Sequence, residues 1–270
     1  MLYANPLFIP TVVGAVIFFG VGATLERKMQ SKARRVCLLL VAVLLACPGL
    51  LFVLYYLHLF DSAAWFYNLR TAQYTELFAA GMGFLAGVVH AWWEPESMAE
   101  KAAVPGVLFV LVLIPFVKPL LDPLDLSQLK DRCEGDVCLQ STFSTCGPAS
   151  AATLLKTFGD DASERELARE SFTSRGGTEI WYLARALERR GIGTRVVIKA
   201  VGANMILPGP AIAGVVLPGN AGHFIALVTS DDKQVTFVDP MKGKATLSVE
   251  QLKRQYHFTG FFLLLSQART

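Results

Sequence analysis

Hydrophobic positions follow two different patterns along the chain. Before residue 122 they form four long apolar blocks, at 7–25, 36–60, 72–93 and 102–121. Each is long enough to cross a hydrocarbon layer of roughly 30 Å as a helix, although the third is weakened by Glu76 and His90. Buried helices of a soluble protein are the alternative, but two blocks exceed about 18 residues almost without charge. We therefore expect a bundle of about four transmembrane helices over residues 1–122.

Beyond residue 122 the apolar runs become short and periodic. Residues 123–138 read as a linker, and residues 139–267 are enough for one packed domain. The helical spacing of apolar residues, a capping-box pattern at Ser163–Glu166 and a possible cap at Thr178 mark the helices. We expect helices at Pro148–Phe158, from Ser163 through Glu170, at Glu179–Arg190 ending at Gly191, and at Ser248–Tyr256.

The strands come after most of the helices. The pattern predicts them at Arg195–Ala200, Ala211–Leu217, His223–Thr229, Gln234–Asp239 and Phe261–Leu265. Helices followed by strands indicate an α+β domain with an antiparallel sheet.

Charge predicts how the chain lies in the membrane. The chain is 53% apolar and 17% charged, and the segment Glu26–Arg35 holds five Lys or Arg residues, so this loop should face the cytoplasm. With four crossings, both ends of the chain are then expected outside, in a multi-pass protein of the cell (inner) membrane. If the third block fails to cross, the C-terminal domain faces the cytoplasm. No basic segment followed by a cleavage site opens the sequence, so we expect no removed signal peptide.

The formal net charge of +3 reflects mainly that basic loop. The domain after residue 123 is close to neutral and has no basic face interleaved with aromatic residues, so nucleic acid is not an expected partner. The expected partners are the lipid bilayer and a peptide or protein substrate.

The five cysteines have different expected roles. Cys37 and Cys47 lie in an apolar block and should be buried packing residues. In an oxidising compartment Cys133 and Cys138 can form a disulfide, which leaves Cys146 as the odd thiol. The sequence offers no further His or Cys pair for a zinc site there, so we expect no metal and no cofactor.

Cys146 stands immediately before the helix that Pro148 begins. Backbone N–H groups and the dipole at a helix start favour the thiolate, which is the reactive form, and Gly147 removes a side chain that would block approach to the sulfur. A buried cysteine in a helix cap is the alternative interpretation.

A histidine and an aspartate complete a possible site. A hairpin with its turn at Ser230–Asp232 would place His223 directly opposite Asp239 on one face, where the carboxylate can orient the imidazole toward the thiol. Gln140, six residues before Cys146, can donate an amide N–H to an oxyanion, although a solvated loop glutamine is the simpler interpretation. The other histidine of the domain, His257, is expected at the surface or in packing.

These residues carry a resemblance to a known family. Gln140-x5-Cys146-Gly147-Pro148-Ala149, then Gly222-His223-Phe224 and Val238-Asp239-Pro240, resemble the bacteriocin-processing cysteine peptidases. The likeness covers roughly residues 136–265, and Thr145 stands where that family usually has Asp. The resemblance implies a papain-like domain that cleaves leader peptides, commonly after a double glycine. It also implies Gln140 in the oxyanion hole, Cys146 as nucleophile, His223 as base and Asp239 as the orienting carboxylate.

The sequence thus predicts a membrane-embedded cysteine peptidase that acts on exported or membrane-tethered precursors, with its catalytic domain outside. A thiol acyltransferase or transpeptidase with the same three residues is an alternative, since the choice of acceptor depends on pocket shape. A catalytically silent binding or assembly module is another. The chain has no phosphate-binding loop, so it does not power transport itself.

Overall fold

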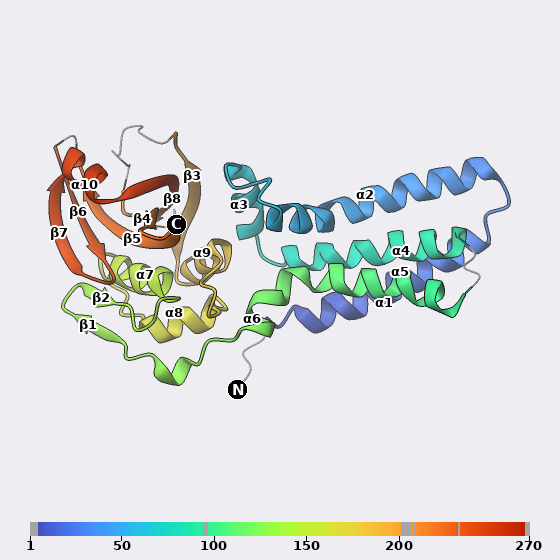
Figure 1. Ribbon diagram of the computed structural model, residues 1–270, viewed down its shortest axis with the longest axis horizontal. Helices are drawn as coiled ribbons and strands as arrows, with labels where there is room; N and C mark the ends of the chain where they lie inside the picture. The colour runs from blue at the N-terminus through green and yellow to red at the C-terminus, as the bar shows by residue number, and fades with distance from the viewer. Residues whose placement is uncertain (1–4, 94–96, 201–206, 208, 232, 268–270) are drawn as a thin grey trace. The chain divides into compact units, whose positions relative to one another are not determined.

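The computed structural model describes residues 5–93, 97–200, 207, 209–231 and 233–267. The chain divides into two compact units, which are described separately (Figure 1). The helical unit comprises residues 4–62 and 74–120. The α+β unit comprises residues 63–73 and the described residues from 121 onward.

The helical unit contains most of the apolar sequence. Its elements are α1 (Phe8–Arg27), α2 (Lys32–Tyr56), η1 (Thr75–Ala80), α4 (Gly81–Trp92), α5 (Met98–Leu113), η2 (Ile114–Phe116) and α6 (Val117–Leu121). In the described residues, three helical stretches are long and apolar enough to cross a membrane: Phe8–Arg27, Lys32–Tyr56 and Met98–Leu121. The expected count of about four such helices is therefore corrected to three, because block 72–93 folds as a 3-10 segment followed by a helix of 12 residues.

The packing of α4 explains its glycines. A Cβ on Gly83 would lie 2.1 Å from the carbonyl oxygen of Ala15, and one on Gly87 would lie 2.1 Å from that of Phe19. Only glycine allows the backbones of α4 and α1 to approach this closely, as is common between membrane helices. Since α4 also packs against α2 and α5, much of it is covered by protein and needs fewer large apolar side chains.

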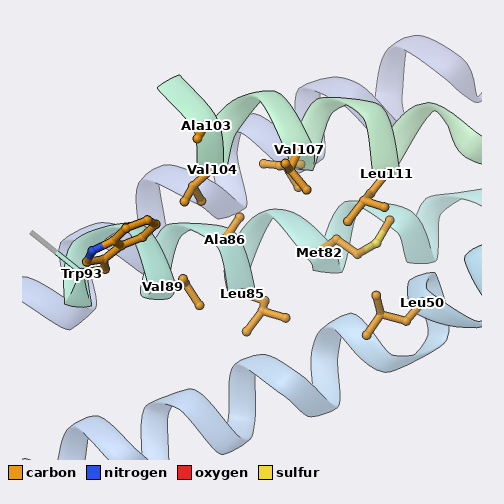
Figure 2. A pocket seen from close by; sticks show the side chains of 11 residues that line it. Leu50, Met82, Leu85, Ala86, Val89, Trp93, Ala103, Val104, Val107 and Leu111 are labelled. Carbon is orange, nitrogen blue, oxygen red and sulfur yellow. The ribbon is translucent and has the colours of Figure 1, made fainter. Parts of the chain in front are cut away.

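An apolar cavity of about 330 Å³ lies between α2, α4 and α5 (Figure 2). Leu50, Met82 and Leu111 point into it, and Trp93 lies at one end. The residues that line it carry no charge.

The α+β unit is built on an antiparallel sheet of six strands in the order β3-β8-β4-β5-β6-β7. The strands are β3 (Ile192–Ile198), β4 (Ala211–Leu217), β5 (Ala221–Ser230), β6 (Gln234–Asp239), β7 (Gly243–Ser248) and β8 (His257–Gln267). A separate two-stranded hairpin joins β1 (Arg132–Glu134) to β2 (Val137–Leu139) and follows η3 (Leu126–Gln128). The predicted α+β class with an antiparallel sheet is confirmed.

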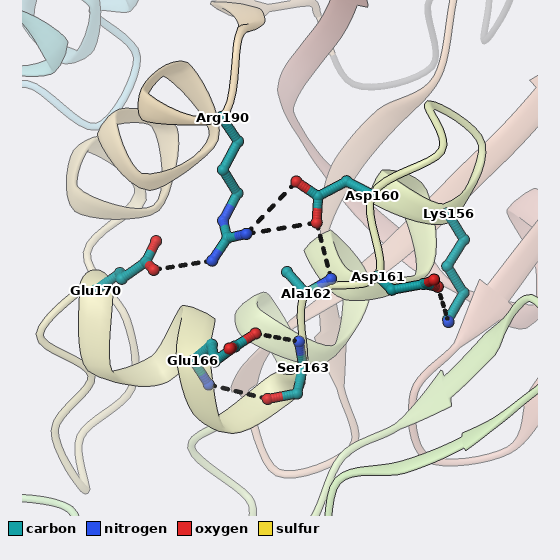
Figure 3. Close-up of polar contacts among 8 residues, drawn as sticks. All are labelled: Lys156, Asp160, Asp161, Ala162, Ser163, Glu166, Glu170 and Arg190. Carbon is teal, nitrogen blue, oxygen red and sulfur yellow. Dashed lines mark hydrogen bonds and ion pairs between the residues drawn. The ribbon is translucent and has the colours of Figure 1, made fainter.

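Among its described residues, this unit has five α-helices: α3 (Ala64–Thr71), α7 (Cys146–Lys156), α8 (Glu164–Glu170), α9 (Ile180–Arg189) and α10 (Val249–Gln255). The predicted capping box at the start of α8 is confirmed, with Ser163 and Glu166 each bonded to the other's backbone N–H (Figure 3). The cap predicted at Thr178 is wrong. Glu179 occupies the position before α9, and the Thr178 hydroxyl instead pairs with that of Thr173 at 2.7 Å.

Ion pairs connect α7, α8 and α9. Arg190, which follows α9, lies 2.8 Å from a Glu170 carboxylate oxygen at the end of α8, and 3.4 Å from Asp160 in the loop after α7 (Figure 3). One guanidinium group therefore connects three helical segments. Helix α7 also contacts the sheet, because the Ser150 hydroxyl donates to the Phe224 carbonyl of β5 at 3.2 Å.

A buried apolar cluster fills the space between the sheet and α10. Leu252 and Tyr256 pack there with Ile225, Val235 and Phe237. These strand residues share a face with His223 and Asp239, since side chains alternate along a strand. The fold therefore brings Tyr256 to the same side of the sheet as the two candidate site residues.

Candidate active site

Cys146 is the first residue of α7 and is buried. The preceding Thr145 has non-helical backbone angles, so α7 begins at the cysteine itself rather than at Pro148 as predicted. Pro148 still lies in the first turn, where its missing N–H costs nothing because the first N–H groups of a helix have no partner within the helix. The Cys146 thiol therefore lies at the electropositive end of a buried helix.

His223 and Asp239 meet in the interior of the α+β unit. The imidazole Nε2 lies 3.0 Å from Asp239 Oδ1, and both side chains are almost fully buried. The other ring nitrogen, Nδ1, remains for Cys146, whose side chain interacts with the His223 ring. The structure thus brings together the thiol, the imidazole and the carboxylate that the sequence singled out.

The predicted register of β5 and β6 is wrong, although the pair still forms. Ala226 lies opposite Val238, so Asp239 is not directly opposite His223, and the register shifts again between Leu227 and Thr229. The pairing of β5 with β6 ends at Ala226, and the preceding residues of β5 pair with β4. Since the offset is two residues, His223 and Asp239 still share a face, and diagonal neighbours remain within reach of long side chains.

The contacts of His223 favour its charged form. Burial alone would lower the pKa of the His223 imidazole, but the hydrogen bond to Asp239 and the interaction with Cys146 outweigh burial and raise this pKa to about 9. Burial alone would raise the pKa of Asp239, but hydrogen bonds from His223, Tyr256 and the Met241 N–H lower it to about 2. The arrangement therefore favours the imidazolium form of His223 beside a charged Asp239.

Sequence reasoning missed Tyr256, which holds the carboxylate from its other side. Its buried hydroxyl donates to Asp239 Oδ2 at 2.6 Å, while the Met241 N–H donates to Oδ1 at 2.9 Å. Burial and the neighbouring carboxylate raise the pKa of Tyr256, so it stays protonated as a donor. Tyr256 and Asp239 are 17 residues apart in the sequence, and they meet because α10 packs against the sheet.

The backbone of Gln140 is hydrogen-bonded next to Asp239. Its N–H donates to the carbonyl of Pro240, the residue that follows Asp239, at 2.9 Å. Its side-chain Nε2 donates to the Thr142 carbonyl at 2.9 Å, which leaves the second N–H of that amide available. The buried Oε1 has no hydrogen-bond partner within the part of the chain that the structure describes.

Thr145 and Gly147 shape the loop and helix around the sulfur. The Thr145 hydroxyl accepts from the Thr142 N–H at 3.1 Å and donates to its carbonyl at 3.0 Å, so it closes the turn before Cys146. A Cβ on Gly147 would lie 3.3 Å from Leu183 Cδ2 and 3.5 Å from Phe224 Cδ2. The glycine is thus explained by close packing of α7 against α9 and β5, rather than by open access to the sulfur.

The remaining cysteines differ in their surroundings. Cys133 and Cys138 form a disulfide across the β1–β2 hairpin. The hairpin is fixed to α7 because the Cys138 N–H donates to the Thr153 hydroxyl at 3.0 Å. Cys37 and Cys47 are free and exposed, which corrects the expectation that they are buried: α2 packs through the face that carries Ala42, Ala46, Gly49 and Phe52. His257, expected at the surface or in packing, is exposed at the start of β8.

No cluster of three or more His, Cys, Asp or Glu side chains suited to a metal ion occurs within the described ranges. The chemistry that Cys146, His223 and Gln140 can support is that of a nucleophile, a base and a hydrogen-bond donor.

Comparison with known sequences identifies a family and two relatives. The model of the peptidase C39 family matches residues 135–270. A protein of Methanothermobacter thermautotrophicus is 29% identical over 134 residues, which are 48% of this chain and 88% of the relative. A protein of Methanothermobacter marburgensis is 30% identical over 131 residues, which are 47% of this chain and 86% of the relative.

Two solved structures are also similar to the chain. One is the peptidase domain of Streptococcus ComA, a bifunctional ABC transporter of a quorum-sensing pathway, with a TM-score of 0.42, 24% identity, and coverage of 49% of this chain and 98% of that domain. The other is a double-glycine-motif protease from an AMS/PCAT transporter in complex with a leader peptide. Its TM-score is 0.42 and its identity 23%, with coverage of 52% of this chain and 96% of the protease.

Proposed function

The chain belongs to the peptidase C39 family and is a cysteine peptidase, and from this premise we propose which residues carry its chemistry. The proposed nucleophile is Cys146, the proposed base is His223, and Asp239 orients the imidazole. The observation that supports this assignment is the buried His223–Asp239 pair at 3.0 Å, whose ring also interacts with Cys146. Such an arrangement of nucleophile, base and orienting group is typical of covalent catalysis.

The proposed reaction begins with a thiolate and an imidazolium. The Cys146 sulfur attacks the carbonyl carbon of the peptide bond and forms a tetrahedral intermediate with a negatively charged oxygen. The intermediate collapses when His223 gives its proton to the leaving amine, which leaves a thioester on Cys146. His223 then removes a proton from water, and the hydroxide attacks the thioester and releases the acid.

Gln140 is the proposed side-chain donor to the oxyanion. One of its amide N–H groups is held by the Thr142 carbonyl, so the orientation of the amide is fixed before substrate binds. Backbone N–H groups at the start of α7 can supply further donors, because they have no partner within the helix. A preorganised donor of this kind is worth about 10²–10³ in rate.

The proposed substrates are peptide or protein precursors that are exported or tethered to the membrane. Three helical stretches with the length and composition of membrane spans support membrane embedding of the chain. The Cys133–Cys138 disulfide supports a catalytic domain outside the cytoplasm, where disulfides persist. Leader peptides of exported products are the class that the family resemblance favours.

A thiol-directed activity probe tests the nucleophile. The purified full-length protein should be labelled at one site, and Cys146→Ala should abolish labelling, whereas the exposed thiols are controlled by Cys37→Ala and Cys47→Ala. Equal labelling of wild type and Cys146→Ala would end the proposal. Mass analysis of peptide products with and without an added amine separates hydrolysis from acyl transfer, because only a transferase yields the amide product.

A further inference from the structure

Helix α3 lies between two apolar regions of the sequence, yet it belongs to the α+β unit. The Asn68 side chain accepts from the Val196 N–H at 2.9 Å and donates to the Val196 carbonyl at 3.0 Å. Val196 is part of β3, the strand at one end of the sheet order. The Asn68 amide therefore pairs with the edge of β3 at Val196, as the backbone of a neighbouring strand would.

A second group of contacts fixes the C-terminal end of α3. The buried Arg185 of α9 donates to the backbone carbonyls of Arg70 and Thr71 at 2.5 and 3.1 Å, where the last carbonyls of a helix need partners. The Arg70 guanidinium lies 4.7 Å from the centre of the Trp181 ring. The side chains of Arg70, Trp181 and Arg185 are all buried, so α3 is part of the core of this unit rather than a loosely attached loop.

The placement of α3 determines the parity of membrane crossings. Residues 63–73 and 121–270 belong to one compact unit, and that unit can lie on only one side of a membrane. The segment 74–120 leaves this unit and returns to it. We infer that this segment crosses the membrane an even number of times.

The stretch Met98–Leu121 has the length and composition of a membrane span, so a second crossing must lie between residues 74 and 97. The helical stretch made by η1 and α4, Thr75–Trp92, is the candidate. At about 2.0 Å per residue in a 3-10 helix and about 1.5 Å in an α-helix it is roughly 30 Å long. Its glycines run beside α1, with Gly83 against Ala15 and Gly87 against Phe19, so it follows α1 through the same depth.

The chain therefore crosses four times, although three helices meet the usual criteria of length and apolar composition. The four crossings form two pairs, α1 with α2 and the η1–α4 stretch with Met98–Leu121, and the second crossing of each pair returns the chain to the side that holds α3. Because α1 and α2 form the other pair, their connecting loop lies on the opposite side from α3 and the catalytic residues. The family match begins at residue 135, so α3 is an addition to the matched domain.

Cysteine accessibility tests the crossing number in the full-length protein. In a background with Cys37, Cys47 and Cys146 changed to Ala and the disulfide retained, single cysteines replace four exposed residues: Gln30, Gln73, Lys101 and Glu250. A membrane-impermeant maleimide is applied to intact cells and then to permeabilised cells. The inference predicts that Gln73→Cys and Glu250→Cys label from one side, and that Gln30→Cys and Lys101→Cys label from the other.

If Gln73→Cys and Lys101→Cys label from the same side, η1 and α4 do not cross and the inference is overturned. The comparison between positions tests the crossing number, whereas the side that Glu250→Cys occupies tests the proposed outside location. The crossing number and the outside location can therefore be refuted independently, and neither test depends on peptidase activity.

Hydrogen exchange tests the contact that underlies the inference. Asn68→Ala removes both bonds to Val196, so amide exchange in peptides that cover β3 should become about tenfold faster, the factor that corresponds to one hydrogen bond. Gln73→Ala, which removes an exposed amide two residues beyond α3, should leave it unchanged. Equal exchange rates in Asn68→Ala and Gln73→Ala would show that α3 does not cover this edge.

Discussion

At the scale of single residues, one carboxylate receives three hydrogen bonds. Asp239 accepts from Tyr256 and from the Met241 N–H, and it pairs with His223. Each donor stabilises the charged form, which is why the pKa of Asp239 falls to about 2 despite burial. The carboxylate is thus charged throughout the pH range in which a peptidase works.

Tyr256→Phe should show the value of this network. The change removes a hydrogen bond to a charged group and should lower the free energy of unfolding at pH 7 by about 1.5–3 kcal/mol. A group whose pKa is lowered by folding stabilises the fold above its ordinary pKa of about 3.9 and loses that contribution as pH falls toward 2. The difference between variant and wild type should therefore shrink between about pH 4 and pH 2, as measured by urea unfolding. A difference that stays constant with pH would contradict this role.

Gln140→Ala should reduce kcat by about 10²–10³ if the amide stabilises the oxyanion. KM should change much less, because the interaction forms mainly in the transition state. Gln128→Ala, an exposed amide in η3, serves as the matched control. Equal kcat values for the two variants in a peptide-cleavage assay would remove Gln140 from the proposed site.

At the scale of elements, the β1–β2 hairpin fixes the chain just before Gln140. The disulfide joins the two strands, Thr153 bonds the Cys138 N–H, and Lys244 pairs with Asp136 at 2.5 Å. These contacts hold β2 against α7 and β7 and so determine where the segment after Leu139 begins.

Replacing both Cys133 and Cys138 by Ser should lower stability, because the open chain has more conformations. For so short a loop the chain-entropy relation gives about 2 kcal/mol at 25 °C. Thermal unfolding of wild type with and without reductant provides the comparison, and reductant should have no effect on the double variant. If reductant destabilises both proteins equally, the disulfide is not the cause.

Elements with strong local signals could be predicted from the sequence. The bounds of β4 and β6 agree with the prediction, and α8 begins at its capping box. By contrast, β7 was missed because its sequence GKATLS is mostly polar and its residues are largely exposed. Helix α3 was not predicted, because it has only eight residues and its partners, such as Val196 and Arg185, lie more than 100 residues away.

The candidate site shows the same division. Cys146, His223 and Asp239 could be found because a helix start and two strand ends mark them in the sequence. The register of β5 and β6 could not be predicted, because the shift between Leu227 and Thr229 depends on packing in the sheet rather than on local sequence. Tyr256 follows α10 and reaches Asp239 only in the folded sheet, so no local pattern identifies it.

At the scale of the whole molecule, the two units place different demands on the sequence. A membrane span covered by other helices does not need continuous large apolar residues, so the glycines of α4 do not exclude a crossing. The topology then follows from where α3 belongs, which composition cannot show. This is why the sequence predicted about four crossings with one uncertain, and why the three long helices are an incomplete count of the crossings we infer.

The most direct test of the proposed chemistry is the rate at which Cys146 is alkylated as a function of pH. The measurement uses iodoacetamide and mass spectrometry on the full-length protein, in a Cys37→Ala, Cys47→Ala background. With the pKa of His223 raised to about 9, the imidazolium should stabilise the sulfur anion at pH 6, so alkylation should stay fast from pH 8 to pH 6. In His223→Ala the rate should fall about tenfold per pH unit below pH 8, as for an isolated thiol that ionises near pH 8.5. At pH 6 the rate of this variant should therefore be about 10²-fold lower than its rate at pH 8. Equal rates at pH 6 in the two proteins would contradict the thiolate–imidazolium pair.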